Sequence, residues 1–366
     1  MTDPEAVGGL GLRWLEADGP DADIVLSTRV RLARNLQGHR FASRTDMDER
    51  RRICDGVARL VDSSSLPGGA RLLAMEGLEA HSRRILLERR LVSHDLVGRV
   101  DGAEPAAGAA LLAWPDAPVS AMVNEEDHLR LQCLVSGLSA VDAWSLVDRL
   151  DVGLGSELPL AFHHDFGYLT SCPTNAGTGL RASALVHLPA LVLTKEIGRV
   201  LEGLDRLGLT HRGVEGEGSR FTGNFFQLSN QTTLGRSEED LIEHFGRTVD
   251  SVVEKEREAR QVLLNAGPRM EDLIWRAYGL LRHARLLDYR DLSELLSGVR
   301  LGVSLGVLKA PAIGSLNRMM VFAQAAHLDE AAGRALSAEE RRCHRAEYVR
   351  AALRDPGEAS TSDAAL

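Results

Sequence analysis

Two kinds of periodicity divide this chain, and the change between them comes at Glu238. Before that residue, apolar and polar residues alternate in short runs, such as 24–30, which is typical of β-strands. After it, apolar residues follow helical spacing, first in a long charged segment at 238–264. The sequence therefore predicts an α+β part followed by an all-helical part.

Turn residues and composition set the expected boundaries of these parts. Asn265, Gly267 and Pro268 would end the long helix, so we expect a catalytic domain at 1–264 and a helical domain at 265–354. The last segment, 355–366, is rich in Ser, Ala and Asp, and we expect it to be disordered. Other strand-like runs lie at 82–92, 119–135, 168–170, 210–216 and 225–234, and other helix-like runs at 46–62, 142–150, 188–207, 270–287, 291–299, 314–328 and 337–354.

Composition argues against several classes of protein. With a formal net charge of -9, the chain does not bind nucleic acid by charge, so any phosphate site must gather its own arginines. No apolar run approaches the ~20 residues of a membrane span, and the acidic start lacks the pattern of a signal peptide. Widely spaced cysteines without a CxxC pair argue against zinc and disulfides. We therefore expect a protein of the reducing cytoplasm and assign no metal-ligating residues.

Paired arginines stand in the first strand-like run. Arg29 and Arg31 are two residues apart, so on a strand they share one face. Two guanidinium groups on one rigid face can hold phosphate oxygens in bidentate fashion. A solvated edge strand would show the same pattern, so the pair alone does not establish a site.

Three consecutive acids stand in the strand-like run 119–135. Glu125, Glu126 and Asp127 would repel one another unless a cation lies against them. Alternation along a strand would place Glu126 on the same face as His128 and Arg130. The alternative is a polar turn between two strands.

A glycine-rich loop follows at 171–183, with the sequence SCPTNAGTGLRAS. Such a loop offers backbone N–H groups to an anion, and Arg181 comes directly after it. It contains no GK[ST] and is therefore not a Walker loop. Cys172 stands at its start, and an inert buried cysteine is the alternative to a reactive one.

Glycines alternate with charged residues at 212–218. Because glycine lets the backbone approach a ligand closely, Arg212 and Glu217 are candidates for direct contact. A flexible surface loop would have the same composition. Taken together, arginines from several segments, isolated glutamates and a cysteine suit phosphoryl transfer from ATP to a cation.

Four blocks carry a resemblance to a known family: STRVRLARN, NEEDHLRLQ, LTSCPTNAGTGLRAS and RGVEGEGS. They resemble the hallmark blocks of the phosphagen (guanido) kinases, and most closely those of bacterial protein-arginine kinases of the McsB type. The resemblance implies an antiparallel sheet flanked by helices, followed by the helical C-terminal domain. It implies ATP with Mg²⁺ as cofactors and phosphorylation of arginine side chains in proteins.

The resemblance also assigns roles to residues. It implies that Glu126 is the catalytic carboxylate, that Glu217 is a second carboxylate on the guanidinium, and that Cys172 is the reactive cysteine. Arg90 stands where the family usually has a histidine that contacts the nucleotide. The implied nucleotide site comprises Ser27, Thr28, Arg29, Val30, Arg31, Arg90, Arg130, Arg181, Ala182, Ser183, Ala184, Leu185, Arg212, Gly213, Val214, Glu215, Gly216 and Glu217.

Partners and regulation are implied in the same way. The family suggests protein substrates with exposed arginine, a homodimer, an activator protein and a Clp-type chaperone-protease in stress-related quality control, with no membrane or nucleic acid. Its C-terminal RDxxRA motif binds phosphoarginine. This chain has Arg341, Arg342 and Arg345 there, with Arg342 in place of the acid, so we expect that regulation to be lost or altered.

Two rival functions remain open from the sequence. One is a kinase of free arginine or another small guanidino compound. The other is an inactive relative that serves as an adaptor, which intact Glu126, Glu217 and Arg181 argue against.

Overall fold

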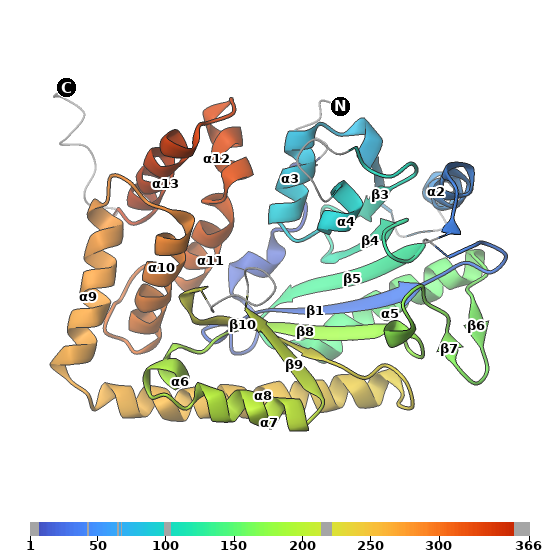
Figure 1. Ribbon diagram of the computed structural model, residues 1–366. Coiled ribbons are helices and arrows are strands. Elements are labelled where there is room, and N and C mark those ends of the chain that lie inside the picture. Colours follow the sequence, from blue (N-terminus) through green and yellow to red (C-terminus); the bar gives the residue numbers. More distant parts are fainter. Residues whose placement is uncertain are drawn as a thin grey trace.

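An eight-stranded sheet forms the centre of the computed structural model, which describes residues 7–41, 44–63, 66, 68–98, 104–213 and 222–354 (Figure 1). Its strand order is β2-β3-β4-β5-β1-β8-β10-β9, and every neighbouring pair is antiparallel. The strands are β1 (Val25–Arg34), β2 (Arg71–Ala74), β3 (Ala110–Ala113), β4 (Val119–Val123), β5 (Leu129–Ser136), β8 (Leu180–His187), β9 (Leu209–Gly213) and β10 (Phe225–Asn230). A separate hairpin pairs β6 (Phe162–His163) with β7 (Gly167–Tyr168).

Helices cover both faces of this sheet. They are α2 (Met47–Asp62), α3 (Ala80–Glu88), α4 (His94–Val97), α5 (Ala140–Glu157), α6 (Pro189–Leu193), α7 (Ile197–Arg206) and α8 (Glu238–Leu264). One face packs on α5 and α8, because Val30 and Leu32 of β1 share an apolar cluster with Val147 of α5 and Val249 of α8. The opposite face meets α3 at β3 and β4, where Leu111 belongs to another cluster.

Five helices follow, and they stack at one end of the sheet (Figure 1). They are α9 (Pro268–His283), α10 (Tyr289–Ser304), α11 (Ile313–Phe322), α12 (Ala325–Ala332) and α13 (Ala338–Ala352). Arg300 of α10 is buried and donates hydrogen bonds to the carbonyls of Ala22 (2.6 Å) and Asp23 (3.3 Å), just before β1. The helices therefore join the sheet through a shared apolar cluster and through buried polar contacts.

Several sequence predictions are confirmed. Helices were expected at 46–62 and 238–264, and α2 and α8 lie there. Beyond Glu238, the described residues contain helices and no strand, as expected. None of the helices in the described ranges is long and apolar enough to span a bilayer. The predicted disorder at 355–366 and the end of the predicted strand at 210–216 fall outside the described residues.

Other expectations were wrong. The run 82–92 was expected to be a strand, but its first part is helix α3, whose buried residues Ser82, Ile85 and Leu86 have the i, i+3, i+4 spacing of a helix face. The expected strand at 119–135 is two strands with a turn at 124–128, which removes the proposed alternation. The single helix expected at 188–207 is two helices, α6 and α7. Strand β8 was not predicted, because its first residues, 180–183, were assigned to the glycine-rich loop and its last residues, 184–187, are continuously buried.

Candidate active site

Five predicted arginines lie on one face of the sheet. Arg31 stands directly opposite Arg181 of β8, and Arg29 stands opposite Ser183 on the same face. Arg130 of β5 pairs with Ala33, two residues beyond Arg31. Arg212 of β9 pairs with Gln227 of β10, and Gln227 pairs with Leu185 of β8. Because paired residues share a face, Arg212 lies on the same face as Arg181. The register therefore gathers four separate strands into one cationic surface.

Four of the five arginines on this cationic surface have no carboxylate partner within the described ranges, and Arg130 is the exception. There, Arg29, Arg31, Arg181 and Arg212 have no carboxylate within 4.0 Å, and the buried Arg31 Nε has no hydrogen-bond partner. Burial, then Arg29, Arg130 and Arg181, hold the pKa of Arg31 well below its ordinary value. Burial, then Arg212 and Arg130, lower the pKa of Arg181. Repelling guanidinium groups with an orphaned donor fit a polyanionic ligand such as a triphosphate.

The turn at 124–128 carries the three acids, and two of its residues are committed to holding it. Asp127 is fully buried and accepts hydrogen bonds from Asn35 Nδ2 (2.7 Å) and from the backbone N–H of Ser171 (2.7 Å). His128 Nδ1 accepts from the Leu36 N–H (3.0 Å), and its Nε2 donates to the Arg40 carbonyl (2.8 Å). Glu126 is left at the surface of the turn, with its side chain 39% exposed.

Glu125 was not predicted as a site residue, and it holds Arg130 in place. Its carboxylate accepts from Arg130 Nη1 (2.8 Å) and from the hydroxyl of Ser93 (2.6 Å), and Arg130 Nη1 also lies 3.1 Å from Glu126 Oε2. Burial would raise the pKa of Glu125, but Arg130 and Ser93 outweigh it and the pKa is lowered. Sequence could have found this residue only through the distant Ser93, because the three acids look alike in the chain.

Cys172 is partly buried at the start of the glycine-rich loop. Its Sγ lies 3.0 Å from Thr174 Oγ1, and its carbonyl accepts from the Thr170 hydroxyl (2.7 Å). Thr233 Oγ1 donates to the carbonyls of Thr174 (3.0 Å) and Ala176 (2.7 Å) from the far side. Since Asp127 binds the neighbouring Ser171 N–H, one acid of the turn fixes the position of the loop.

Arg34 is a second residue that sequence reasoning missed. It is 1% exposed, and it binds Asp151 through Nε (2.9 Å) and Nη2 (2.7 Å) and the Thr178 carbonyl through Nη1 (2.8 Å). Its guanidinium carbon also lies 3.5 Å from the centre of the Tyr168 ring. Arg34 therefore ties the far end of the glycine-rich loop to α5. The sequence shows it only as one more arginine in RVRLAR.

The remaining predicted residues fall into three groups. Thr28, Val30, Ala182 and Ala184 are fully buried and alternate with the arginines, so their side chains face the opposite, apolar side. Ser27, Ser183, Leu185 and Gly213 lie on the strands beside the arginines, and Arg90 lies with its guanidinium carbon 5.5 Å from the Trp14 ring. Val214, Glu215, Gly216 and Glu217 lie outside the described residues.

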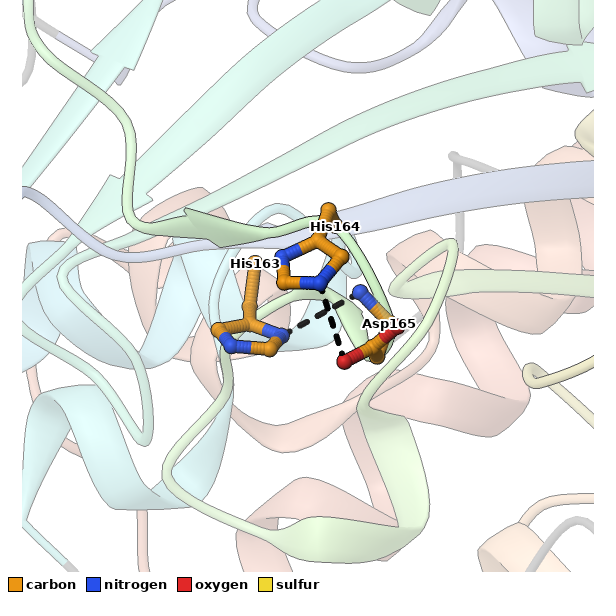
Figure 2. A group of neighbouring side chains, drawn as sticks. All are labelled: His163, His164 and Asp165. Carbon is orange, nitrogen blue, oxygen red and sulfur yellow. Dashed lines mark hydrogen bonds and ion pairs between the residues drawn. The ribbon is translucent and has the colours of Figure 1, made fainter.

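One group of possible metal ligands exists among the described residues: His163, His164 and Asp165, between β6 and β7 (Figure 2). The Asp165 N–H donates to His163 Nδ1 (3.2 Å), and His164 Nε2 lies 3.1 Å from Asp165 Oδ2. His164 and Asp165 are exposed, and the contacts hold the three residues to one another within the turn. We assign no metal to them.

Family models match most of the chain. The ATP:guanido phosphotransferase C-terminal catalytic domain matches residues 54–259, and the protein-arginine kinase McsB C-terminal domain matches residues 268–364. The chain is 43% identical over 343 residues to a protein-arginine kinase of Halalkalibacterium halodurans, covering 93% of this chain and 95% of that one. It is 44% identical over 345 residues to one of Moorella thermoacetica, covering 93% and 97%.

Solved structures show the same fold at lower identity. Lombricine kinase matches with a TM-score of 0.57 and 21% identity, covering 69% of this chain and 71% of that one. The duplicated taurocyamine kinase of Schistosoma mansoni matches with a TM-score of 0.54 and 23% identity, covering 67% of this chain and 33% of that one. At this identity the likeness speaks for the fold alone.

Proposed function

The chain belongs to the ATP:guanido phosphotransferase family, and we propose that it transfers the γ-phosphoryl group of ATP to arginine side chains of proteins. The relatives named protein-arginine kinases support this function, since they match over 93% of the chain. The single structural observation that carries the proposal is the cationic surface of Arg29, Arg31, Arg130, Arg181 and Arg212 with Glu126 beside Arg130.

The arginines suit the donor half of the reaction. A phosphoryl group in flight resembles metaphosphate, and its charge is spread over three oxygens, so fixed cations stabilise the transition state. Arg31 and Arg181 stand opposite each other on the adjacent strands β1 and β8, and they can hold neighbouring phosphates. Arg130 is held by Glu125 and Glu126, which lets it meet the nucleotide without being drawn into the solvent.

Glu126 suits the acceptor half. An arginine guanidinium has a pKa of roughly 12.5–13.8, so it is a poor nucleophile until a base accepts a proton. Glu126 is the acid of the turn with an exposed carboxylate, and we propose it as that base. Cys172 would add a polar contact to the guanidinium, and Glu217 would supply the second carboxylate.

Mg²⁺ fits the same place. This ion usually binds substrate phosphates, a few waters and only one or two carboxylates. The Glu126 carboxylate lies beside the cationic surface and could reach it directly or through water. When bound, the ion would neutralise part of the phosphate charge.

One experiment tests the function. A basic, unfolded protein and free arginine are each incubated with the chain and MgATP, and phosphoarginine is sought by mass spectrometry under mild, non-acidic conditions. We expect phosphoarginine on the protein and little on the free amino acid. Transfer to free arginine alone would establish a small-molecule kinase, and turnover of neither would leave an adaptor.

Assembly and partners extend the proposal. We propose a homodimer through α9, because Trp275 is 51% exposed, Leu280 57% and Leu273 39% on that helix. An activator protein, a Clp-type chaperone-protease and a role in stress are proposed from the family alone. We likewise propose 1–264 and 265–354 as the catalytic and helical domains, and the cytoplasm as the location.

A further inference from the structure

A hollow lies on the opposite side of the sheet from the arginines, between α5, the β6–β7 hairpin and the start of α8. Its two halves have volumes of about 590 and 520 Å³, and they share Phe162, Tyr168 and Glu238. We call it the acidic groove. Its polar residues are acids apart from a few hydroxyls and Arg236: Asp148, Asp151, Glu238 and Glu239 in one half, and Asp165 and Asp240 in the other.

Some of these acids form no ion pair within the described residues, although Arg34 acts on Asp148 through space and opposes the rise of its pKa. Asp151 and Glu238 both bind Arg34, but Asp148 and Glu239 have no hydrogen bond or ion pair with any described residue. Burial, then the neighbouring Asp151 and Glu239, raise the pKa of Asp148. Glu239 stands in the first turn of α8, where the helix dipole favours an acid. Asp148 lies in the middle of α5, where the helix dipole does not favour an acid.

Apolar and aromatic side chains form the walls. Phe162 is 61% exposed and Val152 is 65% exposed, and Trp144 and Tyr168 complete this surface. An aromatic face next to carboxylates is the environment that a guanidinium or ammonium group prefers. Arg34 already shows this preference at the floor, where it stacks on Tyr168 and pairs with Asp151.

The groove also touches the loop that carries Cys172. Gly177, Thr178 and Thr233 line its second half, and Gly177 pairs with Tyr168 of β7 through a hydrogen bond from Tyr168 N to Gly177 O (2.7 Å). A chain bound in the groove would therefore lie against the back of the glycine-rich loop.

We propose that the acidic groove is a docking site for basic segments of protein substrates, separate from the site that receives the reacting arginine. Charge complementarity selects this occupant, because carboxylates between aromatic walls fit arginine and lysine side chains and repel anions. The inference rests on the proposed function, which supplies arginine-bearing proteins as partners. The groove makes no contact with the transferred phosphoryl group. Its contribution is to hold a substrate longer near the catalytic surface.

The test uses the full chain and two peptides, each with one acceptor arginine, flanked by lysines in one and by serines in the other. The variant Asp148→Asn with Glu239→Gln removes two negative charges from the groove and leaves Asp151 and Glu238 on Arg34. We expect KM for the lysine-flanked peptide to rise about 5-fold, with kcat unchanged. KM for the serine-flanked peptide should stay the same.

A matched control separates the groove from overall charge. Glu254→Gln with Glu258→Gln removes the same charge from the exposed side of α8 and should change neither KM. An equal rise of KM in this control, or no rise in the groove variant, would overturn the inference. The reversed variant Asp148→Lys with Glu239→Lys should instead favour a glutamate-flanked peptide, and failure to do so would also count against it.

Binding without catalysis keeps the two proposals distinguishable. Anisotropy of a labelled lysine-only peptide, which has no arginine to phosphorylate, should show weaker binding to the groove variant than to the parent chain. That result would support the groove even if no phosphoarginine formed. Equal binding, with phosphoarginine still formed on proteins, would overturn the groove and leave the proposed function intact.

Discussion

The two neighbouring glutamates in the turn at 124–128 differ in burial, and we therefore expect them to have different roles. Glu125 is 8% exposed, and its carboxylate accepts hydrogen bonds from Arg130 and Ser93. The carboxylate of Glu126 is exposed. We expect Glu126→Gln to lower the rate of transfer by ~10²–10⁴-fold, as loss of a positioned base does. ATP affinity, measured by calorimetry, should stay nearly the same.

Glu125→Gln is the comparison for that experiment. It leaves Arg130 without its main partner in a buried place, so the free energy of unfolding should fall by about 1–3 kcal/mol. Glu126→Gln should leave this quantity within about 0.5 kcal/mol of the parent chain. Full activity in Glu126→Gln would remove this residue from the proposed mechanism.

Arg34 gives a second prediction at this scale. It is 1% exposed and its partner Asp151 is 6% exposed, so Arg34→Ala would strand a buried carboxylate. We expect the free energy of unfolding to fall by about 3–5 kcal/mol in urea denaturation. Arg34→Lys should recover only part of this loss, because an ammonium cannot bind Asp151 and the Thr178 carbonyl with one planar group. Arg247→Ala, at an exposed pair with Glu243, serves as the control and should be nearly silent.

At the scale of elements, a buried histidine connects β8 to α10. His187 is fully buried, and its Nε2 lies 2.8 Å from the Ser297 hydroxyl of α10. Burial, then Arg300 and Arg260, hold the pKa of His187 well below its ordinary value. In the folded chain it stays neutral, while in the unfolded chain it gains a proton below about pH 6.5.

The sign of the pH dependence follows from this difference. Above about pH 6.5, His187 is neutral in both states and the free energy of unfolding does not depend on its protonation. Below that pH, the unfolded chain binds a proton that the folded chain does not, so the free energy of unfolding falls by up to about 1.4 kcal/mol per pH unit. We expect the loss of stability between pH 7 and pH 5, measured by urea denaturation, to be smaller in His187→Gln than in the parent chain. His164→Gln on the exposed turn should keep the parent slope, and identical slopes in all three chains would refute the role of His187.

The same scale shows what could be predicted from the sequence and what could not. The α2 and α8 helices have long periodic patterns with a cap, Asp46 or Ser237, at the start, and both were found with nearly correct ends. Strand β8 begins with alternating residues that continue the glycine-rich loop at 171–183, and its last residues, 184–187, are continuously buried, so the pattern did not separate the strand from the loop. Short apolar runs such as the one in α3 fit a strand or a helix equally well, and only tertiary packing decides between them.

Part of the candidate site could be predicted from the sequence, and part of it could not. The arginines could be predicted because two-residue spacing and glycine-rich context are visible in the chain. The partners of Asp127 and of Glu125, which are Ser171 and Ser93, are remote in sequence and become visible only in the fold. The sequence likewise could not show that residues 124–128 form a turn, because charged residues occur in strands and in turns alike.

At the scale of the whole molecule, the exposed apolar residues of α9 predict the oligomeric state. Trp275 and Leu280 are more than half exposed on one helix. We expect Trp275→Asp with Leu280→Asp to convert a dimer into a monomer in light scattering, with little change in the melting temperature because neither side chain is in the core. If this variant stays dimeric, the dimer interface does not lie on α9.

Regulation by phosphoarginine is also a question for the whole molecule. Arg341 binds the largely buried Asp329 (2.6 and 3.0 Å), Arg342 lies 3.1 Å from Asp288, and Arg345 donates to the carbonyls of Ala323 and Leu287. The guanidinium groups of Arg341 and Arg345 are held by hydrogen bonds, whereas Arg342 has an exposed ion pair and its Nε makes no hydrogen bond to a described residue. We therefore expect free phosphoarginine to activate the chain no more than inorganic phosphate at equal concentration. A saturable activation by phosphoarginine that Arg341→Ala abolishes would show that the pocket still works.

The placement of Arg29 and Arg31 on β1 and of Arg181 on β8 has a consequence for how the chain finds its native pairing. If either strand slid by one residue against its neighbour, Arg29 and Arg31, or Arg181, would turn into the apolar layer beneath α5. Burying an unpaired guanidinium there would cost several kcal/mol, so a mispaired sheet would be too unstable to persist. The arginines that we propose for the reaction would thus also favour the native strand alignment, and a chain without them would pair its strands less accurately.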